Sequence, residues 1–253
     1  EIASCLVGSE MCIRDRTGTF LAEGLKFIGE ALDQGRAPRM LLVGEDARPH
    51  PLLDRAKAET RKAGGDIIIV THAILEKISR RDNPQTVLGV FEQAYAPLDS
   101  LDPASAPCWV ALEQVRDPGN LGTIIRTADA AGCGGVILIG DCVDPYSVEA
   151  VRATMGSVFA VSITKTTPDA FLAWRKTWPG SVVGTRLDAT VSHRSAMMQK
   201  PSLILMGNEQ AGLTDQLAAA CDVNVKIPMR GRADSLNLAI ATGIMVYAAT
   251  DEA

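Results

Sequence analysis

Six short apolar runs in the second half of the chain constrain its fold more than any other feature of the sequence. They are rich in Val, Ile and Leu, and each is too short for a buried helix: Cys108–Leu112, Val136–Ile139, Val158–Ile163, Ser181–Thr185, Leu203–Met206 and Val223–Ile227. Strands without polar alternation are typical of a parallel sheet that helices cover on both faces. Residues 108–253 are therefore predicted to form an α/β domain on a parallel sheet.

The longest apolar stretch is Leu236–Ala249, which contains the polar residues Asn237 and Thr242. It is shorter than the roughly 20 apolar residues that a membrane crossing needs. The stretch therefore predicts a buried helix, and no membrane segment is expected.

The first half of the chain alternates in the same way on a smaller scale. Strands are predicted at Met40–Val43, Asp66–Val70 and Val87–Phe91, and helices at Leu52–Ala63 and Ala73–Ser79. Residues 17–95 are therefore expected to form a smaller α/β domain. Residues 96–107 contain three prolines and are expected to link it to the second domain.

One further helix is predicted at the start of the smaller domain. Leu21, Leu25, Ile28 and Leu32 repeat at helical spacing, and Gly35 would end the helix. Residues 1–16 lack an initiating Met, a signal-peptide pattern and a clear period, and they resemble translated sequencing-adaptor sequence. We expect that segment to be non-native and assign it to neither domain.

The formal net charge of −5 disfavours a uniformly basic surface of the kind that binds nucleic acid. An RNA site would have to be a local patch. Two clusters are candidates, and both are equally compatible with solvated helix faces: Arg55, Lys57, Arg61 and Lys62, or Lys77, Arg80 and Arg81.

The six cysteines and three histidines show no CxxC spacing and no His–Cys cluster. This spacing predicts neither a metal site nor a disulfide framework. Free thiols fit a reducing compartment, and the protein is expected in the cytoplasm.

The first segment with candidate functional residues runs from Asp117 to Gly132. Asn120 is predicted to cap a helix that ends at Gly132. Arg126 falls opposite the apolar stripe of that helix and is expected to face solvent. A capped helix with one solvated arginine explains this segment equally well.

The second segment follows the run Leu203–Met206 and has the sequence GNEQAG, from Gly207 to Gly212. A strand that leads into a glycine-flanked acidic loop lies at the carboxyl edge of the sheet, where open α/β sheets bind ligands. Gly207 would let a ligand approach the backbone closely, and Glu209 is the charged group of the loop. An ordinary strand-to-helix turn is the alternative.

The third segment runs from Ile227 to Asn237, between the last strand and the long apolar helix. Ser235 is predicted to cap that helix. Asn237 would then lie in the first turn, where a buried amide without a partner costs roughly 1–3 kcal/mol. Its partner could be a functional group or simply the neighbouring backbone.

Together, NLGTIIRTADAAG, LILMGNEQAGL and IPMRGRADSLNLAIATGIMVYAA resemble, in order and spacing, the three motifs of the SpoU (TrmH-like) family of RNA 2′-O-ribose methyltransferases. This family belongs to the SPOUT superfamily, whose C-terminal chain forms a trefoil knot. Through FLAEGLKFIGEAL and NPQTVLGVF, residues 17–92 resemble the family's N-terminal substrate-binding module, which has an L30e-like α/β fold.

The resemblance implies a cofactor, a substrate and an assembly. It implies S-adenosylmethionine as cofactor, bound at Gly207, Ile227, Met229 and Leu236. The implied substrate is a ribose 2′-hydroxyl of structured RNA, with ribosomal RNA favoured over transfer RNA. A homodimer formed through the knot domain is also implied, with a site that draws on both subunits.

The resemblance also implies the roles of polar residues at the reaction site. Arg126 matches the arginine beside the target ribose and its phosphate. The groups that match those shaping the reaction site are Asn120, Glu209, Ser235 and Asn237.

Three alternatives to a ribosomal-RNA methyltransferase differ in what they require of the sequence. A transfer-RNA 2′-O-methyltransferase would carry the same motifs. A non-catalytic RNA-binding knot protein would not need the polar residues of all three segments. A Rossmann dinucleotide enzyme is disfavoured, because the glycines at 132, 134 and 135 precede a predicted strand where a dinucleotide loop would follow one.

Overall fold

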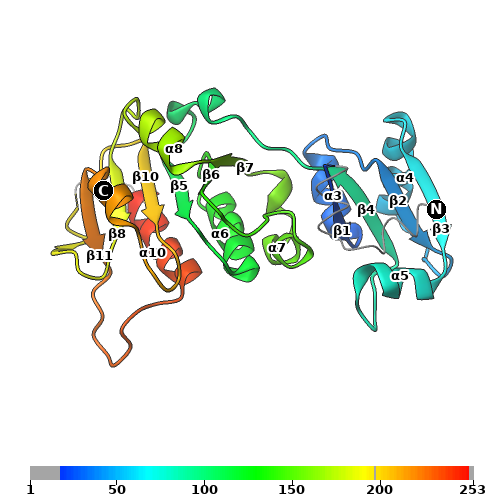
Figure 1. Cartoon of the computed structure of the whole chain (residues 1–253). Helices are drawn as coiled ribbons and strands as arrows, with labels where there is room; N and C mark the ends of the chain where they lie inside the picture. Colours follow the sequence, from blue (N-terminus) through cyan, green and yellow to red (C-terminus); the bar gives the residue numbers. More distant parts are fainter. Residues whose placement is uncertain (1–17, 197, 251–253) are drawn as a thin grey trace. The chain divides into compact units, whose positions relative to one another are not determined.

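A computed structural model describes residues 18–196 and 198–250 of the 253-residue chain (Figure 1). The expected non-native segment 1–16 lies outside the described residues. The described chain forms two compact units, one of residues 18–94 with 146–160 and one of residues 95–145 with 161–250.

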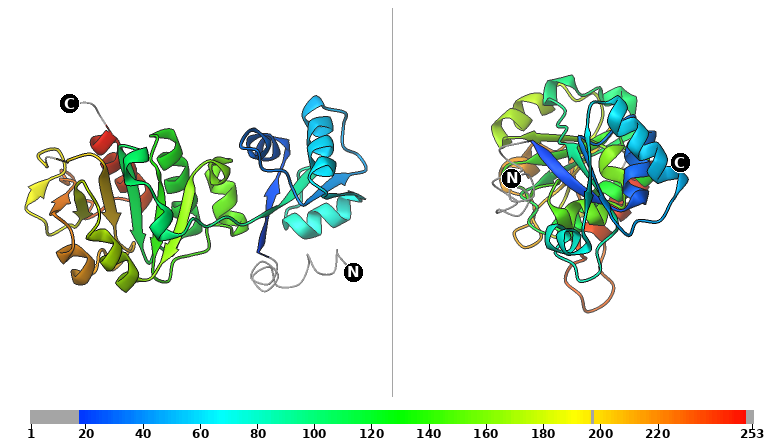
Figure 2. Two further views of the ribbon diagram at one scale, coloured as in Figure 1. Left: turned by 90° about the horizontal axis from the view of Figure 1, so that it is seen from above. Right: turned by 90° about the vertical axis from the view of Figure 1, so that its right-hand side faces the viewer.

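The first unit is built on a four-stranded mixed sheet in the order β1-β4-β2-β3 (Figures 1 and 2). Its strands are β1 (Thr19–Glu23), β2 (Met40–Gly44), β3 (Asp66–Val70) and β4 (Val87–Glu92). Strand β4 runs antiparallel to β1 and β2, whereas β2 and β3 are parallel. Its helices are α3 (Leu25–Asp33), α4 (Pro51–Lys62) and α5 (His72–Ser79). A smaller α/β domain was predicted for this part of the chain, and it is confirmed.

The predicted helix starting at Leu21 is wrong for its first residues, which form β1. Phe20 and Ala22 are buried, as expected for a strand that covers a core. Gly24 then turns the chain with φ 94°, a conformation that favours glycine, and α3 starts at Leu25. Leu21 happens to satisfy the helical spacing of the residues that follow.

Residues 146–160 lie late in the sequence but belong to the first unit. They form α7 (Val148–Thr154) and the 3₁₀ turn η3 (Ser157–Phe159). The ring of Phe159 lies 5.6 Å from that of Phe20, and Arg152 binds Glu23 and the carbonyl of Ser79. The strand expected at Val158–Ile163 is therefore wrong in its first half, and β7 is Ser162–Thr166.

The second unit contains a seven-stranded sheet in the order β7-β6-β5-β10-β8-β11-β9, in which every pair is parallel. Its remaining strands are β5 (Cys108–Glu113), β6 (Gly135–Ile139), β8 (Val182–Thr185), β9 (Val191–Ser192), β10 (Ser202–Met206) and β11 (Val223–Lys226). Its helices are α6 (Pro118–Ala130), α8 (Pro168–Arg175), α9 (Asp215–Ala219) and α10 (Leu238–Thr250). The predicted parallel α/β domain is confirmed.

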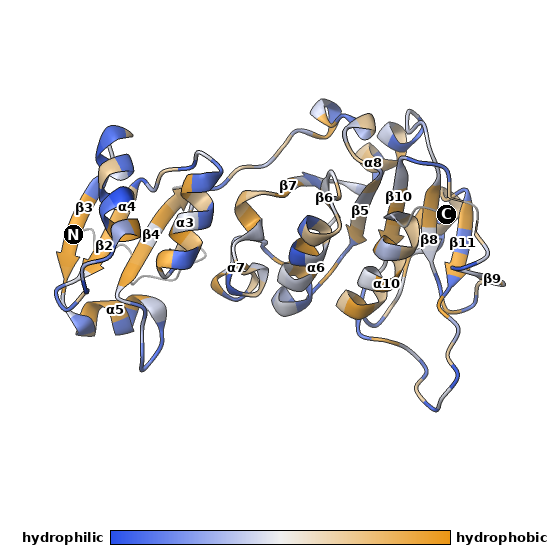
Figure 3. Ribbon diagram, turned by 180° about the vertical axis from the view of Figure 1, so that it is seen from behind, coloured by the Kyte–Doolittle hydropathy of each residue, from blue (hydrophilic) through white to orange (hydrophobic). Residues whose placement is uncertain are grey.

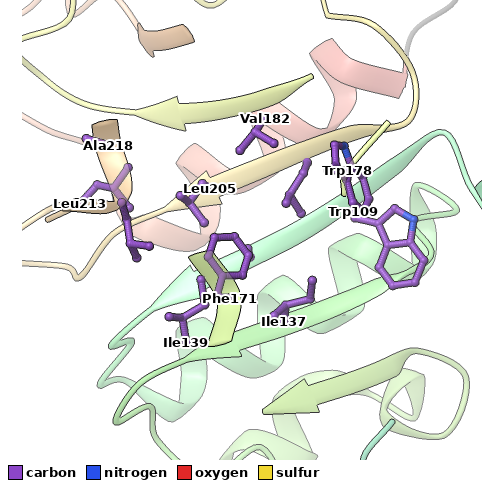
Figure 4. Packing of buried hydrophobic residues seen from close by; sticks show 12 residues of the cluster. Trp109, Ile137, Ile139, Phe171, Trp178, Val182, Leu205, Leu213 and Ala218 are labelled. Atoms are coloured by element: carbon purple, nitrogen blue, oxygen red, sulfur yellow. The ribbon is translucent and has the colours of Figure 1, made fainter. Parts of the chain in front are cut away.

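The core of the second unit lies between this sheet and α8. Phe171 of α8 is fully buried and belongs to one apolar cluster with Ile137, Leu205, Trp109 of β5 and Trp178, which follows α8 (Figure 4). The segment predicted as a linker contributes to this packing. It contains the 3₁₀ turns η1 (Leu98–Ser100) and η2 (Pro103–Ser105), and Leu98 and Leu101 contact the core.

The path of the last ninety residues brings distant segments to one edge of the sheet. Strand β11 lies two positions from β10, yet α10 packs on α6, β10 and β5. The chain must therefore return across the carboxyl edge of the sheet over residues 227–237 (Figure 1). Among the helices of the described residues, none combines the length and the hydropathy that a membrane crossing needs.

Candidate active site

A hollow of about 380 Å³ opens at the carboxyl edge of the parallel sheet, where β8, β10 and β11 end. Three chain segments wall it: residues 185–188, 206–213 and 227–241. The predicted site residues that line it are Gly207, Glu209, Ile227, Met229, Ser235 and Leu236. A hollow of this size lies within the range that small-molecule ligands occupy.

Gly207 lies where two parts of one loop meet. Asn208 and Gly212 exchange backbone hydrogen bonds of 3.0 and 2.9 Å, so the loop folds back over Gly207. A Cβ at Gly207 would lie 2.0 Å from the backbone of Gly212 and Leu213. Only glycine fits this position, and the wall of the hollow at this point is bare backbone.

The same loop is held by side chains at both ends. Asn208 donates to the carbonyl of Gln114 at 2.8 Å and accepts from the N–H groups of Gln210 and Ala211. The backbone N–H and hydroxyl of Thr214 each donate to the buried carboxylate of Glu113 at 2.8 Å. The loop at 207–214 is thus fastened to the end of β5.

Glu209 turns away from the loop toward the start of α6. Its carboxylate accepts hydrogen bonds from the backbone N–H groups of Arg116 and Asp117 at 3.2 Å and from Asn120 at 3.3 Å. Partial burial raises the pKa of Glu209, but the backbone and Asn120 hydrogen bonds outweigh that effect and lower the net pKa. The carboxylate is therefore ionised at neutral pH, and both of its oxygens accept hydrogen bonds from the protein.

Asn120 and Asn237 connect this carboxylate to α10. Asn237 donates from Nδ2 to Oδ1 of Asn120 at 2.8 Å. Its own Oδ1 accepts from the N–H groups of Ala239 and Ile240. All three sequence segments therefore meet in one chain of hydrogen bonds, from α10 through Asn237 and Asn120 to Glu209.

Two predicted helix caps are wrong. Asp117, and not Asn120, caps α6, because its side chain accepts from the N–H of Asn120 three residues on and Pro118 takes the first helical position. Asn237, and not Ser235, caps the first N–H groups of α10. Ser235 is exposed and lines the hollow without a hydrogen bond to any described residue.

Arg126 lies on the exposed side of α6, as its place opposite the apolar stripe predicts. It does not line the hollow, and it has no hydrogen bond or ion pair with the described residues. Within a single chain, Arg126 therefore shares α6 with Asn120 but does not reach the hollow.

The sequence interpretation missed the segment at the end of β8. Thr185, Arg186, Leu187 and Asp188 line the hollow. Arg186 binds Asp188 through two hydrogen bonds of 2.8 and 2.9 Å and Asp215 through one of 2.7 Å. These hydrogen bonds raise the pKa of Arg186, and Arg186 lowers that of Asp188, so both stay charged. The only available signal was that another strand ends at the same edge.

Thr185 carries a polar atom that has nothing to bind. Its Oγ1 is buried and has no hydrogen-bond partner among the described residues. Buried hydroxyls are normally satisfied, so an orphan at a ligand hollow indicates a group that the ligand supplies. Together with the bare backbone at Gly207 and the apolar walls at Ile227 and Met229, this fits a ligand with both apolar and hydrogen-bonding parts. No group of residues in the described part of the chain has the arrangement of a metal site.

Two protein-family models match this chain, one in its second half and one in its first. The model of the SpoU rRNA Methylase family matches residues 107–247, and that of the MRM3-like substrate binding domain matches residues 12–89. The 23S rRNA (guanosine(2553)-2′-O)-methyltransferase RlmP of Bacillus subtilis is 30% identical over 235 residues, which cover 92% of this chain and 89% of the relative. The 23S rRNA (uridine(2479)-2′-O)-methyltransferase of Streptomyces viridochromogenes is also 30% identical, over 93% of this chain and 84% of its own.

Solved structures agree with these relatives. The AdoMet-bound rRNA methyltransferase from Sinorhizobium meliloti is 46% identical with a TM-score of 0.91, covering 98% of this chain and 93% of that one. The SpoU methyltransferase AviRb from Streptomyces viridochromogenes, in complex with AdoMet, is 30% identical with a TM-score of 0.85, covering 98% and 95%.

The parallel sheet, the loops that meet around the hollow at its carboxyl edge and the similar solved structures define an RNA methyltransferase of the SPOUT class. The chain belongs to the SpoU rRNA methylase family. The predicted family and fold class are therefore confirmed.

Proposed function

We propose that this chain transfers the methyl group of S-adenosylmethionine to a ribose 2′-hydroxyl of ribosomal RNA. The observation that carries this proposal is the hollow at the carboxyl edge, which is lined by the second and third of the three SpoU-like segments and by residues 185–188. The two named relatives act on 23S rRNA, and the structures from Sinorhizobium meliloti and of AviRb hold the cofactor. They support ribosomal RNA as the substrate and S-adenosylmethionine as the cofactor.

The cofactor is held by backbone groups and apolar side chains. When bound, it supplies an activated methyl group on a sulfonium. Gly207, Ile227, Met229 and Leu236 line the hollow and are its proposed contacts. Because Gly207 has no side chain, the loop can close on the backbone of Gly212 and Leu213, and Gly207 itself presents only backbone to the hollow. The chain thus contributes mainly orientation, which suits a reaction whose donor is already activated.

The polar residues divide into two kinds in this proposal. Glu209, Asn120 and Asn237 bind one another and the backbone, so they position the walls of the site. Ser235 has no partner among the described residues and is the group available to contact the substrate.

Arg126 is proposed to bind the phosphate beside the target ribose and to lower the pKa of its 2′-hydroxyl. A guanidinium has a pKa above about 12, so it is a poor general base but a good bidentate partner for phosphate. Arg126→Lys should therefore lose most turnover while its affinity for S-adenosylmethionine stays normal. Near-normal turnover of Arg126→Lys would contradict this role.

A homodimer would explain why Arg126 lies away from the hollow of its own chain. Helix α10 is apolar nearly all round, yet Ile240 and Tyr247 are 58% and 49% exposed, and α10 packs beside α6. An exposed apolar face of this kind fits a second copy of the chain. We infer that the partner subunit supplies its Arg126 to this hollow.

Mixing two inactive variants tests this assembly. Arg126→Ala removes the arginine, and Leu236→Asp places a charge in the hollow at a residue that is 37% exposed. If each site combines one hollow with the partner's arginine, an equal mixture recovers about one quarter of wild-type activity, since half the dimers are mixed and each restores one site. No recovery from variants that exchange subunits would contradict the shared site.

We propose that residues 17–95 form the L30e-like RNA-binding domain, residues 96–107 the linker, and residues 108–253 the methyltransferase domain. The match of residues 12–89 to a substrate-binding domain supports the first of these. A cytoplasmic location is supported by the free thiols of Cys108, Cys133, Cys142 and Cys221.

The direct test is methyl transfer from labelled S-adenosylmethionine to unmodified ribosomal and transfer RNA. Label in ribosomal RNA, lost in Arg126→Ala, is the expected result. Label in transfer RNA alone would contradict ribosomal RNA as the substrate but would agree with an RNA methyltransferase. Normal cofactor binding without transfer to free RNA or ribosomal particles would favour a non-catalytic RNA-binding protein.

A further inference from the structure

The loop between β11 and α10 carries two arginines at its exposed tip. We call residues 228–235 the arginine loop, after Arg230 and Arg232. It projects from the second unit (Figure 1), and its tip is largely hydrophilic (Figure 3). Every residue of the loop except Met229 is exposed. The two ends of the loop reach the hollow, because Met229 and Ser235 line it.

Arg230 and Arg232 have no hydrogen bond or ion pair with any described residue. Arginines elsewhere in the described chain are mostly engaged with carboxylates or carbonyls: Arg36, Arg39, Arg55, Arg81, Arg116, Arg152, Arg175 and Arg186. The arginine loop has one acidic residue of its own, Asp234. Its two guanidinium groups are therefore available to an outside anion.

The backbone of the arginine loop is equally free. Among the hydrogen bonds of the described residues, none uses a backbone N–H group of residues 229–235. Gly231 separates the two arginines, and a Cβ there would meet nothing within 4 Å. A ligand backbone can thus approach between the two side chains and reach donors of the main chain as well.

We propose that the arginine loop binds the sugar–phosphate backbone of the substrate RNA through Arg230 and Arg232. This inference rests on the proposed function. The guanidinium fork matches phosphate oxygens bidentately, and phosphate contacts fix the register of a nucleic acid. Because the ends of the loop line the hollow, phosphates held at its tip lie on the strand that delivers the target ribose. The loop gives an acidic protein a local cationic contact at the place where RNA must enter.

The carboxylate of S-adenosylmethionine is the competing anion for these arginines. The two ligands can be separated, because cofactor binding is measured without RNA. A double Arg230→Ala/Arg232→Ala variant should bind S-adenosylmethionine as the wild type does. Its affinity for ribosomal RNA should fall about tenfold or more at physiological salt, with KM raised and kcat little changed.

The charge-matched control is Lys176→Ala/Lys200→Ala. Both lysines are exposed, and each precedes a strand at the amino edge of the sheet, opposite the hollow. This variant loses the same two charges and should bind RNA nearly as well as the wild type. Arg230→Lys/Arg232→Lys keeps the two positive charges but loses the guanidinium forks. Its RNA affinity should lie between those of Arg230→Ala/Arg232→Ala and the control.

The experiment is RNA binding by fluorescence anisotropy over a salt series, with cofactor binding by calorimetry. The wild-type slope of log affinity against log salt should fall by about 1–2 in Arg230→Ala/Arg232→Ala, since each lost contact removes about 0.7–0.9. An unchanged slope, an equal loss in the control, or weaker cofactor binding would overturn the proposal. RNA binding is read without methyl transfer, so a wild type that binds RNA but transfers nothing refutes the proposed function alone.

Discussion

Two walls of the same hollow are built in opposite ways. The loop at 207–213 is fastened by Asn208, by Glu209 and by its own backbone pairing with Gly212. No backbone N–H group of the arginine loop at 228–235 donates a hydrogen bond to the described residues, and its two arginines have no partner among them. Hydrogen bonds within the protein fix the conformation of the first wall, whereas the hydrogen-bond donors of the second wall remain available to a ligand.

This difference follows from what each wall is proposed to hold. A cofactor that must present its methyl group in line needs a surface that does not move, because small displacements cost rate. An RNA backbone needs charge and free donors more than a fixed shape. The asymmetry assigns the exposed tip of the arginine loop to the RNA. The cofactor is assigned to the fastened wall, together with Ile227, Met229 and Leu236, which line the hollow near the two ends of the arginine loop.

The largest expected effect comes from replacing one glycine in each wall by alanine. In Gly207→Ala the new Cβ would lie 2.0 Å from the facing backbone, so the loop must move. We expect cofactor affinity to fall at least about 100-fold and the unfolding free energy to fall by about 2–4 kcal/mol. Gly231→Ala is the control, since its Cβ meets nothing, and thermal unfolding with calorimetry should show no change. Equal effects in the two variants would refute the comparison.

Glu209→Gln tests the fastening of the first wall. Arg116 donates to one carboxylate oxygen and Asp117 to the other, so the NH2 group of glutamine would face at least one backbone N–H donor in either orientation. We expect a loss of about 1–3 kcal/mol in urea unfolding, with weaker cofactor binding. Unchanged stability at neutral pH would show that these hydrogen bonds hold nothing in place.

The same carboxylate predicts a pH dependence. The folded-state pKa of Glu209 is lowered from its ordinary value of 4.5, so its contribution to stability is fully present above that value. As the pH falls through the lowered pKa, the contribution is lost. The stability difference between wild type and Glu209→Gln should therefore be constant from neutral pH down to about pH 5 and shrink below it. A difference that grows on acidification would contradict the lowered pKa.

Asn237→Ala should destabilise the protein more than Ser235→Ala. Asn237 caps α10 and binds Asn120, whereas Ser235 does neither. Loss of the cap should cost about 1 kcal/mol. Ser235→Ala should leave the melting temperature unchanged and lower turnover. A larger loss of stability in Ser235→Ala than in Asn237→Ala would indicate that Ser235 caps α10.

The smallest expected effect concerns Thr185. Thr185→Val removes a buried hydroxyl that has no partner in the described chain, so the free protein should be as stable as the wild type or slightly more so. If the hydroxyl binds the cofactor, affinity should fall about 3–10-fold, and Thr185→Ser should retain it. Lower stability of the free protein with normal affinity would show a merely structural role.

The sheet of the second unit was predictable because its strands are buried on both faces. Apolar runs such as Leu203–Met206 therefore stand out without any alternation. The convergence of Asn120, Glu209 and Asn237 could be predicted only through the family resemblance, since the three residues are far apart in sequence. Their partners could not, because a hydrogen bond across 89 or 117 residues leaves no local pattern.

The errors have local physical causes. Leu21 fits both the strand and the helical period, and the turn at Gly24 decides between them. Pro118 at the first helical position was a readable signal that α6 starts before Asn120. The place of α7 with the first unit depends on tertiary contacts of Phe159 and Arg152, which no helical period reveals.

The most direct test of the account is the chemical position of the transferred methyl group. After transfer from labelled S-adenosylmethionine, the RNA would be hydrolysed in alkali, which cannot cleave a linkage whose 2′-oxygen carries a methyl group. Label in alkali-resistant dinucleotides from ribosomal RNA is the predicted result. Label released in mononucleotides would mean methylation of a base and would contradict the ribose assignment.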